Sequence, residues 1–246
     1  MPVPLGGKGE WAEVKTLAVG AIAATSSGPS AVDLSYFSRR ADHVTITRLA
    51  TVETHRPGLE TAGAVCGVVD GADWCQQCFD TQRPDAVRIL DFSHAAGYLA
   101  QIAQAAFGPG TAAAAGWLET QRHHLKHDSS ATVLDTIRTL QATVAARLDG
   151  AAAAVTADTI ATCLAYFEKR QAQLCYAAFQ QQGYPIGSGI VESANTLVVE
   201  ARLKGAGMHW APEHVNPMVA LRTVVCASRW DEAWPQVCAQ LRAASP

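Results

Sequence analysis

Several features are absent from this 246-residue chain, and each absence excludes a class of protein. No uninterrupted apolar run is long enough to span a bilayer, and no continuous apolar segment follows the start as it does in a secretory signal. The seven cysteines lack a framework spacing, which favours reduced, mostly buried thiols over disulfides. Charged residues make up 17% and hydrophobic residues 49% of the chain, which argues against disorder. We therefore expect a folded, cytoplasmic protein.

An excess of basic residues is also missing. The net charge is −3 and the pI is about 6.2. A self-sufficient DNA-binding domain is usually basic, because neutralising phosphates dominates its affinity. If this chain contacts DNA, we expect it to do so through small basic patches or together with a DNA-binding part that lies elsewhere.

The first third of the chain carries the patterns of strands. Apolar and polar side chains alternate through residues 11–23, a turn follows at 25–30, and residues 34–39 predict a second strand that completes a hairpin. Residues 42–55 predict a helix with Asp42 as its N-cap. The side chains expected on or near one face of that helix are Val44, Thr47, Leu49 and Val52.

Two short apolar runs, at residues 62–69 and 86–91, predict buried central strands. A short helix is expected between them, at about 73–80. Two apolar strands joined by a helix are typical of parallel pairing. The first run is followed by Asp70 and the second ends at Asp91.

Residues 95–182 change to the 3.6-residue spacing of helices, with two apolar stripes. The first stripe comprises Val133, Leu134, Ile137, Leu140, Val144 and Leu148, and the second comprises Ile160, Cys163, Leu164, Phe167, Leu174 and Cys175. Ser129 or Ser130 is expected to cap the first helix and Thr156 the second. A low-complexity link is expected between the two helices, at residues 149–155.

The end of the second long helix is expected at Gly183 and Pro185, because neither residue continues a helix well. Further helices are expected near residues 213–227 and 230–242. The chain shows no internal repeat.

Two carboxylates are predicted at the ends of secondary-structure elements. Asp70 follows an apolar strand, and Glu192 follows Gly187-Ser-Gly189 on the first turn of a helix. Magnesium prefers oxygen ligands, and paired ions can hold the attacking and leaving oxygens of a phosphodiester. The residues alone leave simpler roles open: Asp70 as the N-cap of the next helix and Glu192 as a charge that stabilises the helix dipole.

Three segments of the chain carry a resemblance to a known family. They are Val68-Val-Asp70-Gly-Ala-Asp-Trp74, Gly187-Ser-Gly-Ile-Val-Glu192-Ser-Ala-Asn195 and Glu200-Ala-Arg-Leu-Lys-Gly-Ala-Gly-Met-His-Trp210. Together they resemble bacterial insertion-sequence DDE transposases of the ISKra group, in the Mutator-like superfamily. The resemblance covers nearly the whole chain, from Trp11 to Trp234. Asp73 stands where the family usually has Glu, and Thr196 where it usually has Lys, which puts one phosphate contact in doubt.

The resemblance implies an α/β fold, a ribonuclease-H-like mixed sheet with a large all-helical insertion and C-terminal helices. Residues 1–94 would form the sheet portion, 95–185 the insertion and 186–246 the C-terminal helices. The family needs a third carboxylate, an Asp on the first strand, which is expected just upstream of Met1. The chain is therefore expected to be N-terminally truncated, with an incomplete first strand, and inactive as written.

The resemblance also implies roles for other residues. Asp91 and His94 are expected near the site, although an N-cap Asp with a His in the first turn is an equally simple explanation. Arg202, Lys204 and His209 are expected to contact DNA phosphates beside Glu192; the alternative is a solvated helix end with Gly205 and Gly207 as its C-cap.

Two other clusters are expected to be incidental. His123, His124 and His127, with Lys126, predict a solvated helix face, with a DNA-backbone patch as the second choice and a metal site disfavoured by the lack of a third spaced ligand. Cys75-Gln-Gln-Cys78 has the spacing of a redox or zinc motif but no partner pair.

The expected function is DNA cleavage and strand transfer during transposition. In the intact protein Asp70, Glu192 and the upstream Asp would hold two magnesium or manganese ions, the partners would be transposon ends and target DNA, and the protein would form a homo-oligomer. No membrane partner is expected. The alternatives are a non-catalytic remnant that folds or associates with intact transposase, and a ribonuclease-H-like host nuclease.

Overall fold

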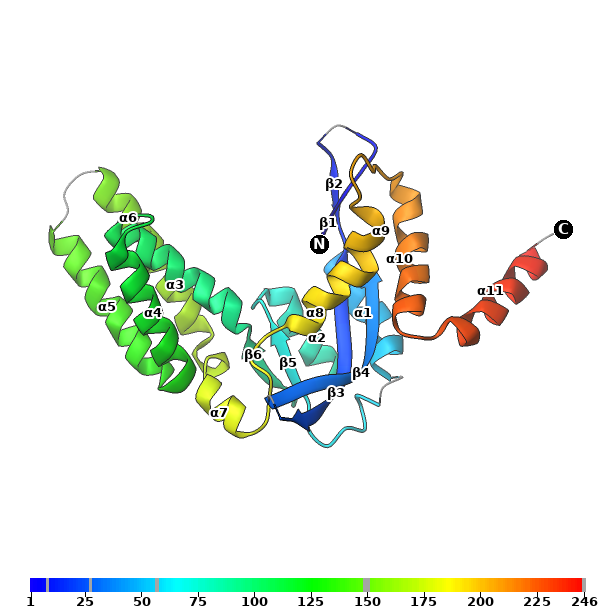
Figure 1. The fold of residues 1–246 in the computed structure, drawn as a ribbon, viewed down its shortest axis with the longest axis horizontal. Helices are drawn as coiled ribbons and strands as arrows, with labels where there is room; N and C mark the ends of the chain where they lie inside the picture. The colour runs from blue at the N-terminus through cyan, green and yellow to red at the C-terminus, as the bar shows by residue number, and fades with distance from the viewer. Residues whose placement is uncertain (8, 27, 56–57, 148–150, 245–246) are drawn as a thin grey trace. The chain divides into compact units, whose positions relative to one another are not determined.

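The computed structural model describes all residues except 8, 27, 56–57, 148–150 and 245–246, and describes residues 147 and 151–153 by their backbone alone. The protein is a mixed α/β structure in which helices dominate (Figure 1). It divides into two compact units, each with its own hydrophobic core. Unit 1 comprises Met1–Gly63, Asp80–Pro84 and Gly189–Pro246, and unit 2 comprises Ala64–Phe79 and Asp85–Ser188.

Antiparallel strands open unit 1. Strand β1 (Pro2–Pro4) pairs with β2 (Trp11–Glu13), and Met1 and Val14 exchange backbone hydrogen bonds beyond the end of this pair. Strand β3 (Lys15–Thr25) pairs with β4 (Gly28–Arg39), so the predicted hairpin is confirmed. Its second strand begins earlier than residue 34, and the predicted strand 11–23 is divided at Val14 into β2 and β3.

Helix α1 (His43–His55) begins after Asp42, whose Oδ1 accepts a hydrogen bond from the backbone N–H of Thr45 at 2.8 Å, as expected of an N-cap. The expected apolar face is not the buried one. Val44 is 66% and Val52 is 68% exposed, whereas the buried positions are Ile46, Ala50, Glu53 and Thr54. The helix turns this way because Glu53 and Thr54 find hydrogen-bond partners in the interior of unit 1.

A helical segment in three parts follows residue 188. It consists of α8 (Gly189–Ala194), a π-helical turn η2 (Asn195–Glu200) and α9 (Ala201–Leu203). The core of unit 1 packs Val198, Val199 and Leu203 from this segment against the strands. Helices α10 (Pro212–Cys226) and α11 (Trp230–Ala244) confirm the two helices predicted near the C-terminus.

Parallel strands lie in unit 2. Strand β5 (Cys66–Val69) pairs in parallel with β6 (Val87–Leu90), and α2 (Asp73–Gln82) follows β5, as predicted. β5 is shorter than the apolar run 62–69 and is only half-buried, whereas Ile89 and Leu90 of β6 are fully buried.

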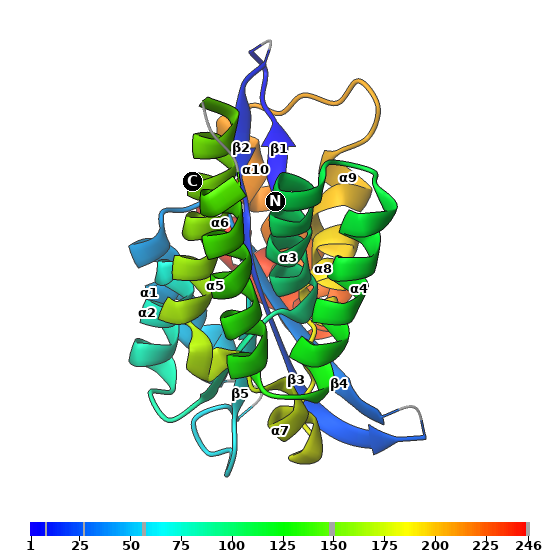
Figure 2. The same ribbon diagram turned by 90° about the vertical axis from the view of Figure 1, so that its left-hand side faces the viewer.

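Four long helices of unit 2 lie side by side (Figures 1 and 2). They are α3 (Phe92–Phe107), α4 (Ala112–His127), α5 (Ser130–Arg147) and α6 (Ala151–Lys169). A short 3₁₀ turn, η1 (Gln171–Gln173), and α7 (Tyr176–Gln181) follow. No strand occurs between residues 92 and 188 in the part of the chain that the structure describes.

Most residues of the two predicted apolar stripes are buried in the structure, as expected. The fully or nearly fully buried members are Val133, Leu134, Ile137, Val144, Ile160, Cys163, Leu164, Phe167 and Leu174. Leu140 is partly buried, Cys175 is exposed, contrary to expectation, and Leu148 lies outside the described residues.

The boundaries of the second long helix were predicted wrongly. Residues 151–155, expected to form a link, belong to α6, because a run of alanines has the highest helix propensity. Thr156 therefore lies inside α6 and donates to the carbonyl of Ala105 instead of capping a helix. α6 ends at Lys169, well before Gly183. None of the described helices is both long and apolar enough to cross a membrane.

Candidate functional site

The ends of β5 and β6 bring two of the predicted carboxylates together. Val69 pairs with Leu90 in the parallel register, so Asp70 and Asp91 follow neighbouring strands at the same edge of the sheet. The backbone N–H of Asp91 donates to the carbonyl of Val69 at 2.7 Å and extends the pairing up to the two acids. This edge is where ligands bind in open parallel sheets.

Asp70 presents an exposed carboxylate at this edge. Its Oδ1 accepts from the backbone N–H of Ala72 at 3.0 Å and lies 3.9 Å from the thiol sulfur of Cys75. Its Oδ2 has no partner among the described residues. Because α2 begins only at Asp73, Asp70 closes a tight turn before the helix and does not occupy the N-cap position.

The turn that carries Asp70 is held by Tyr166 of α6 and by Arg170, which directly follows that helix. The Tyr166 hydroxyl donates to the carbonyl of Asp70 at 2.5 Å, and the buried Arg170 guanidinium donates to the carbonyl of Gly71 through Nε at 2.9 Å and through Nη2. Gly71 has a φ of +82°, and a Cβ placed on it would lie 2.5 Å from the Tyr166 hydroxyl and 2.6 Å from Arg170 Nε. Only glycine fits this position without strain.

Aromatic rings surround the hydrogen bonds that Tyr166 and Arg170 donate to the turn after β5. Tyr98 of α3 stacks on Tyr166 with centroids 4.0 Å apart, and the Arg170 guanidinium lies 4.1 Å from the centroid of Tyr166. The exposed His94 ring packs against Tyr98 in a T-shaped arrangement, with centroids 5.4 Å apart. Burial, the largest cause, raises the pKa of Tyr166 to about 12, so its hydroxyl remains a donor at neutral pH.

Asp73 follows the turn as an exposed charge at the start of α2. Its carboxylate pairs with Lys169 at 2.8 Å and with Arg170 at 3.5 Å. The hydrogen bond from Lys169 is the main reason that the pKa of Asp73 lies below its ordinary value. The pair adds a second link between α2 and α6.

Asp91 is buried, and both of its oxygens accept backbone hydrogen bonds. Oδ1 accepts from the N–H of His94 at 2.7 Å, which makes Asp91 the N-cap of α3, and Oδ2 accepts from the N–H of Ser188 at 2.6 Å. Tyr176, fully buried, donates to the carbonyl of Leu90 at 2.9 Å; burial raises the pKa of this phenol. Asp91 thus anchors the loop before α8 to the end of β6.

Glu192 lies in unit 1, on the first turn of α8, with its carboxylate exposed. It makes no hydrogen bond or ion pair within the described part of the chain. A Cβ built on Gly187 or Gly189 would meet no atom of the protein within 4 Å. Neither glycine has a positive φ.

The three residues predicted to contact phosphates also lie in unit 1. They differ in the hydrogen bonds and ion pairs that they make within the protein. Arg202 is exposed and has no partner among the described residues. Lys204 pairs with Glu200 at 3.2 Å. The Nδ1 of His209 lies 2.8 Å from the carbonyl of Leu5, which leaves the other ring nitrogen for a ligand. The arrangement therefore leaves Arg202 as the cation with the fewest competing contacts.

The two clusters expected to be incidental have local explanations. On α4, His124 pairs with Asp128 at 2.6 Å, and the rings of His123 and His127 lie 4.8 Å apart. Cys75 is buried, and this burial is the main reason that its pKa rises to about 12, which disfavours the nucleophilic thiolate. Within the described residues, no three His, Cys, Asp or Glu side chains are grouped as metal ligands.

The predicted site residues are thus divided between the units. Asp70, Asp91 and His94 belong to unit 2, and Glu192 belongs to unit 1 with the three phosphate-contact candidates. The convergence of Asp70 and Glu192 stays a prediction. The sequence analysis missed Tyr166 and Arg170, although a tyrosine and an arginine four residues apart at the end of an apolar stripe are a signal for a polar contact at the helix end.

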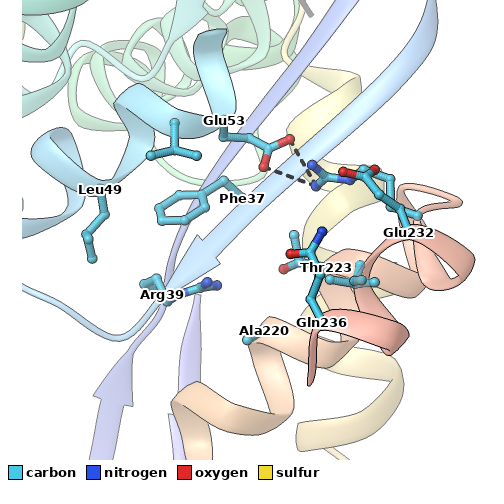
Figure 3. Close-up of a pocket in the computed structure, with 12 residues that line it drawn as sticks. Phe37, Arg39, Leu49, Glu53, Ala220, Thr223, Glu232 and Gln236 are labelled. Carbon is cyan, nitrogen blue, oxygen red and sulfur yellow. Dashed lines mark hydrogen bonds and ion pairs between the residues drawn. The ribbon is translucent and has the colours of Figure 1, made fainter. Parts of the chain in front are cut away.

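A cavity of about 340 Å³ in unit 1 lies between β4, α1, α10 and α11 (Figure 3). Phe37, Arg39, Leu49 and Glu53 line one side of it, and Glu53 pairs with Arg229 at 3.0 Å. None of the predicted site residues lines this cavity.

Comparisons of the chain with protein-family models, with curated proteins and with solved structures give no match.

Proposed function

We propose that this protein is the catalytic portion of a DDE transposase with a ribonuclease-H-like fold, which cleaves and joins DNA. The observation that carries the proposal is the turn after β5. An exposed carboxylate stands at the end of a parallel strand, keeps one oxygen without a partner among the described residues, and is held by hydrogen bonds from a helix of the insertion. This combination is expected of a residue that must meet a ligand in a fixed position.

The donor set suits magnesium or manganese. The carboxylates of Asp70 and Glu192 are both exposed hard oxygen ligands, and neither is neutralised by an ion pair within the described residues. When bound, a pair of such ions stabilises the attacking and leaving oxygens of a phosphodiester. Asp70 and Glu192 would hold the ions, Tyr166 and Arg170 would keep Asp70 in position, and Asp91 would hold the loop that leads to Glu192.

The test is a cleavage and joining assay with oligonucleotides that carry the transposon ends, in magnesium and in manganese. It compares the chain alone with a version that carries an added N-terminal strand bearing Asp. We expect joining from a version that carries this third carboxylate, which the resemblance implies for the metal site. In the active version, Asp70→Asn and Glu192→Gln should abolish joining, whereas Asp73→Asn, a matched exposed acid in the same loop, should preserve it. Full activity of Glu192→Gln would remove this residue from the site.

Metal binding gives a second readout that does not need activity. Titration calorimetry with Mn²⁺ should show binding that Asp70→Asn weakens at least tenfold and that Asp73→Asn leaves unchanged. Equal affinities in the two variants would contradict a metal role for Asp70.

The cations after Glu192 provide a test of DNA contact. Arg202→Ala should weaken binding to DNA of any sequence and lower the slope of log K against log salt by about 1, because one phosphate contact is lost. Lys204→Ala should have a smaller effect, because Glu200 already pairs with Lys204. An unchanged salt slope in Arg202→Ala would contradict the phosphate contact.

A further inference from the structure

The cavity between β4, α1, α10 and α11 is lined by both charged and apolar side chains (Figure 3). Its volume of about 340 Å³ equals that of about eleven molecules of liquid water, at roughly 30 Å³ each. A ligand of about ten non-hydrogen atoms fits such a space. Pockets for small molecules are mostly apolar and carry a few polar groups that fix the orientation of the ligand. The chemistry of the wall therefore indicates the class of ligand.

Arg39 is a cation of the cavity wall that makes no ion pair within the described part of the chain. Its Nη1 donates to the carbonyl of Ser38 at 2.7 Å, and its guanidinium lies 4.6 Å from the centroid of the Phe37 ring. Its Nε and Nη2 make no hydrogen bond among the described residues. Burial, the largest cause, lowers the pKa of Arg39, as expected of a cation that has lost water without gaining a close counter-ion.

The two carboxylates of the wall have other partners. Glu53 is buried and accepts hydrogen bonds from the Ser35 hydroxyl and from Arg229, which lies 3.0 Å away. The charge of Glu53 raises the pKa of Arg39, but by less than burial lowers it. Glu232 is exposed and has a contact of its own within the protein. Because neither carboxylate pairs with Arg39, a carboxylate on a ligand would supply the missing acceptor.

The rest of the wall offers one further polar group and an apolar surface. Gln236 of α11 extends toward the same space as Arg39, and its amide makes no hydrogen bond among the described residues (Figure 3). On the side of α1, Leu49 is 37% and Val52 is 68% exposed, and Val224 of α10 lines the cavity with them. A ring that covers these side chains would remove apolar surface from water while its acid group reaches Arg39.

We propose that this cavity binds a small organic acid, with its carboxylate on Arg39 and an apolar ring against α1 and α10. The pair can be bidentate, because Nε and Nη2 of Arg39 both remain donors. The amide of Gln236 would donate to the same carboxylate. None of the proposed metal ligands lines the cavity, so the proposal does not rest on the proposed catalytic function.

Phenylacetate is a probe of matched size and chemistry. Titration of the ¹⁵N-labelled chain, followed by amide chemical shifts, should give a dissociation constant between about 0.1 and 1 mM, from the affinity per atom that small ligands reach. The shifts should concentrate at residues 37–39, 49–53 and 220–224, which line the cavity or lie beside its lining residues. No saturable binding up to about 10 mM, or shifts centred elsewhere, would overturn the proposal.

Two smaller changes to the probe separate the charge from the ring. 2-Phenylethanol keeps the ring and loses the carboxylate, and acetate keeps the carboxylate and loses the ring. Each should bind about tenfold or more weakly than phenylacetate, because each loses one of the two contacts. Equal affinity of 2-phenylethanol would contradict recognition of the carboxylate by Arg39, and equal affinity of acetate would contradict the apolar part of the site.

A pair of arginine variants tests the anchor. Arg39→Met should weaken phenylacetate binding about tenfold or more, because the charge-assisted hydrogen bonds are lost. Arg48→Met is the matched control, since Arg48 is exposed on α1 and does not line the cavity; it should leave the affinity unchanged within about twofold. Unchanged binding by Arg39→Met would overturn the proposal.

A pair of valine variants gives a readout that leaves Arg39 in place. Val52→Glu puts a carboxylate into the wall at an exposed position and should weaken phenylacetate binding about tenfold or more, by repulsion and by competition for Arg39. Val44→Glu, at a position of the same helix that is 66% exposed and lies outside the cavity, should bind as the unchanged chain does. Equal affinities of these two variants would contradict a site in this cavity, and circular dichroism checks that each variant folds.

Discussion

The turn after β5 in unit 2 and the start of α8 in unit 1 each present one exposed carboxylate, but they are supported very differently. The backbone around Asp70 receives hydrogen bonds from Tyr166 and Arg170, and the neighbouring Asp91 holds two backbone N–H groups. Glu192 has no such support among the described residues. The Asp70 half of the proposed site is therefore held by hydrogen bonds from other elements, whereas Glu192 is held only by its own helix among the described residues.

The two regions also differ in what would be lost with each carboxylate. The Asp91 side chain is 5% exposed and accepts hydrogen bonds from two backbone N–H groups, so removing its carboxylate leaves those two groups without a partner. Glu192 is exposed and makes no hydrogen bond or ion pair within the described structure, so removing its carboxylate should change the free energy of unfolding little. An exposed carboxylate with no partner among the described residues is a candidate for ligand contact.

The largest expected effect on stability is that of Asp91→Ala. The variant loses the N-cap of α3 and the acceptor for Ser188, which should lower the free energy of unfolding by about 3 kcal/mol. Urea denaturation measures the loss, and hydrogen exchange should show faster exchange in α3 and around residue 188. A loss below about 1 kcal/mol would mean that water replaces the carboxylate well.

Gly71→Ala should be the next most severe change. Alanine at a φ of +82° is strained, and its Cβ would collide with Tyr166 and Arg170, so we expect a loss of about 2 kcal/mol. Gly187→Ala is the matched control, because that position has open space and no positive φ; it should be neutral within about 0.5 kcal/mol. Equal losses for the two glycines would show that the turn after β5 is not clamped as described.

Tyr166→Phe should have a smaller effect, about 1 kcal/mol, because it removes one hydrogen bond and keeps the ring that stacks on Tyr98. If the hydroxyl positions Asp70, the affinity for Mn²⁺ should also fall, although Tyr166 is not itself a ligand. Titration calorimetry would measure this. An unchanged affinity would restrict Tyr166 to a structural role.

Glu192→Gln should have the smallest effect on folding, within about 0.5 kcal/mol, because the change is isosteric and the side chain is exposed. Urea denaturation of this variant beside Asp91→Ala tests the comparison directly. A loss of 2 kcal/mol or more at Glu192 would mean that the carboxylate has a structural partner and would remove the contrast between the two regions.

Local patterns predicted much of the fold. The two apolar runs became the parallel strands β5 and β6, and Asp42 caps α1. The predictions failed where a partner distant in sequence decides the outcome. Glu53 is buried in α1 because Arg229 pairs with it, although the two are 176 residues apart, and no local pattern indicates this contact. The π-helical turn at Asn195–Glu200 is likewise invisible to a 3.6-residue periodicity.

The sequence by itself determined which elements form and that Asp70 and Asp91 end two paired strands, because hydrophobic spacing and capping act between neighbours in the chain. Only the tertiary structure decided which groups hold those ends in place. Tyr166 and Arg170 reach the turn after β5 across 96 and 99 residues. Such contacts follow from the packing of whole helices, where side chains on different elements meet only after the core has formed.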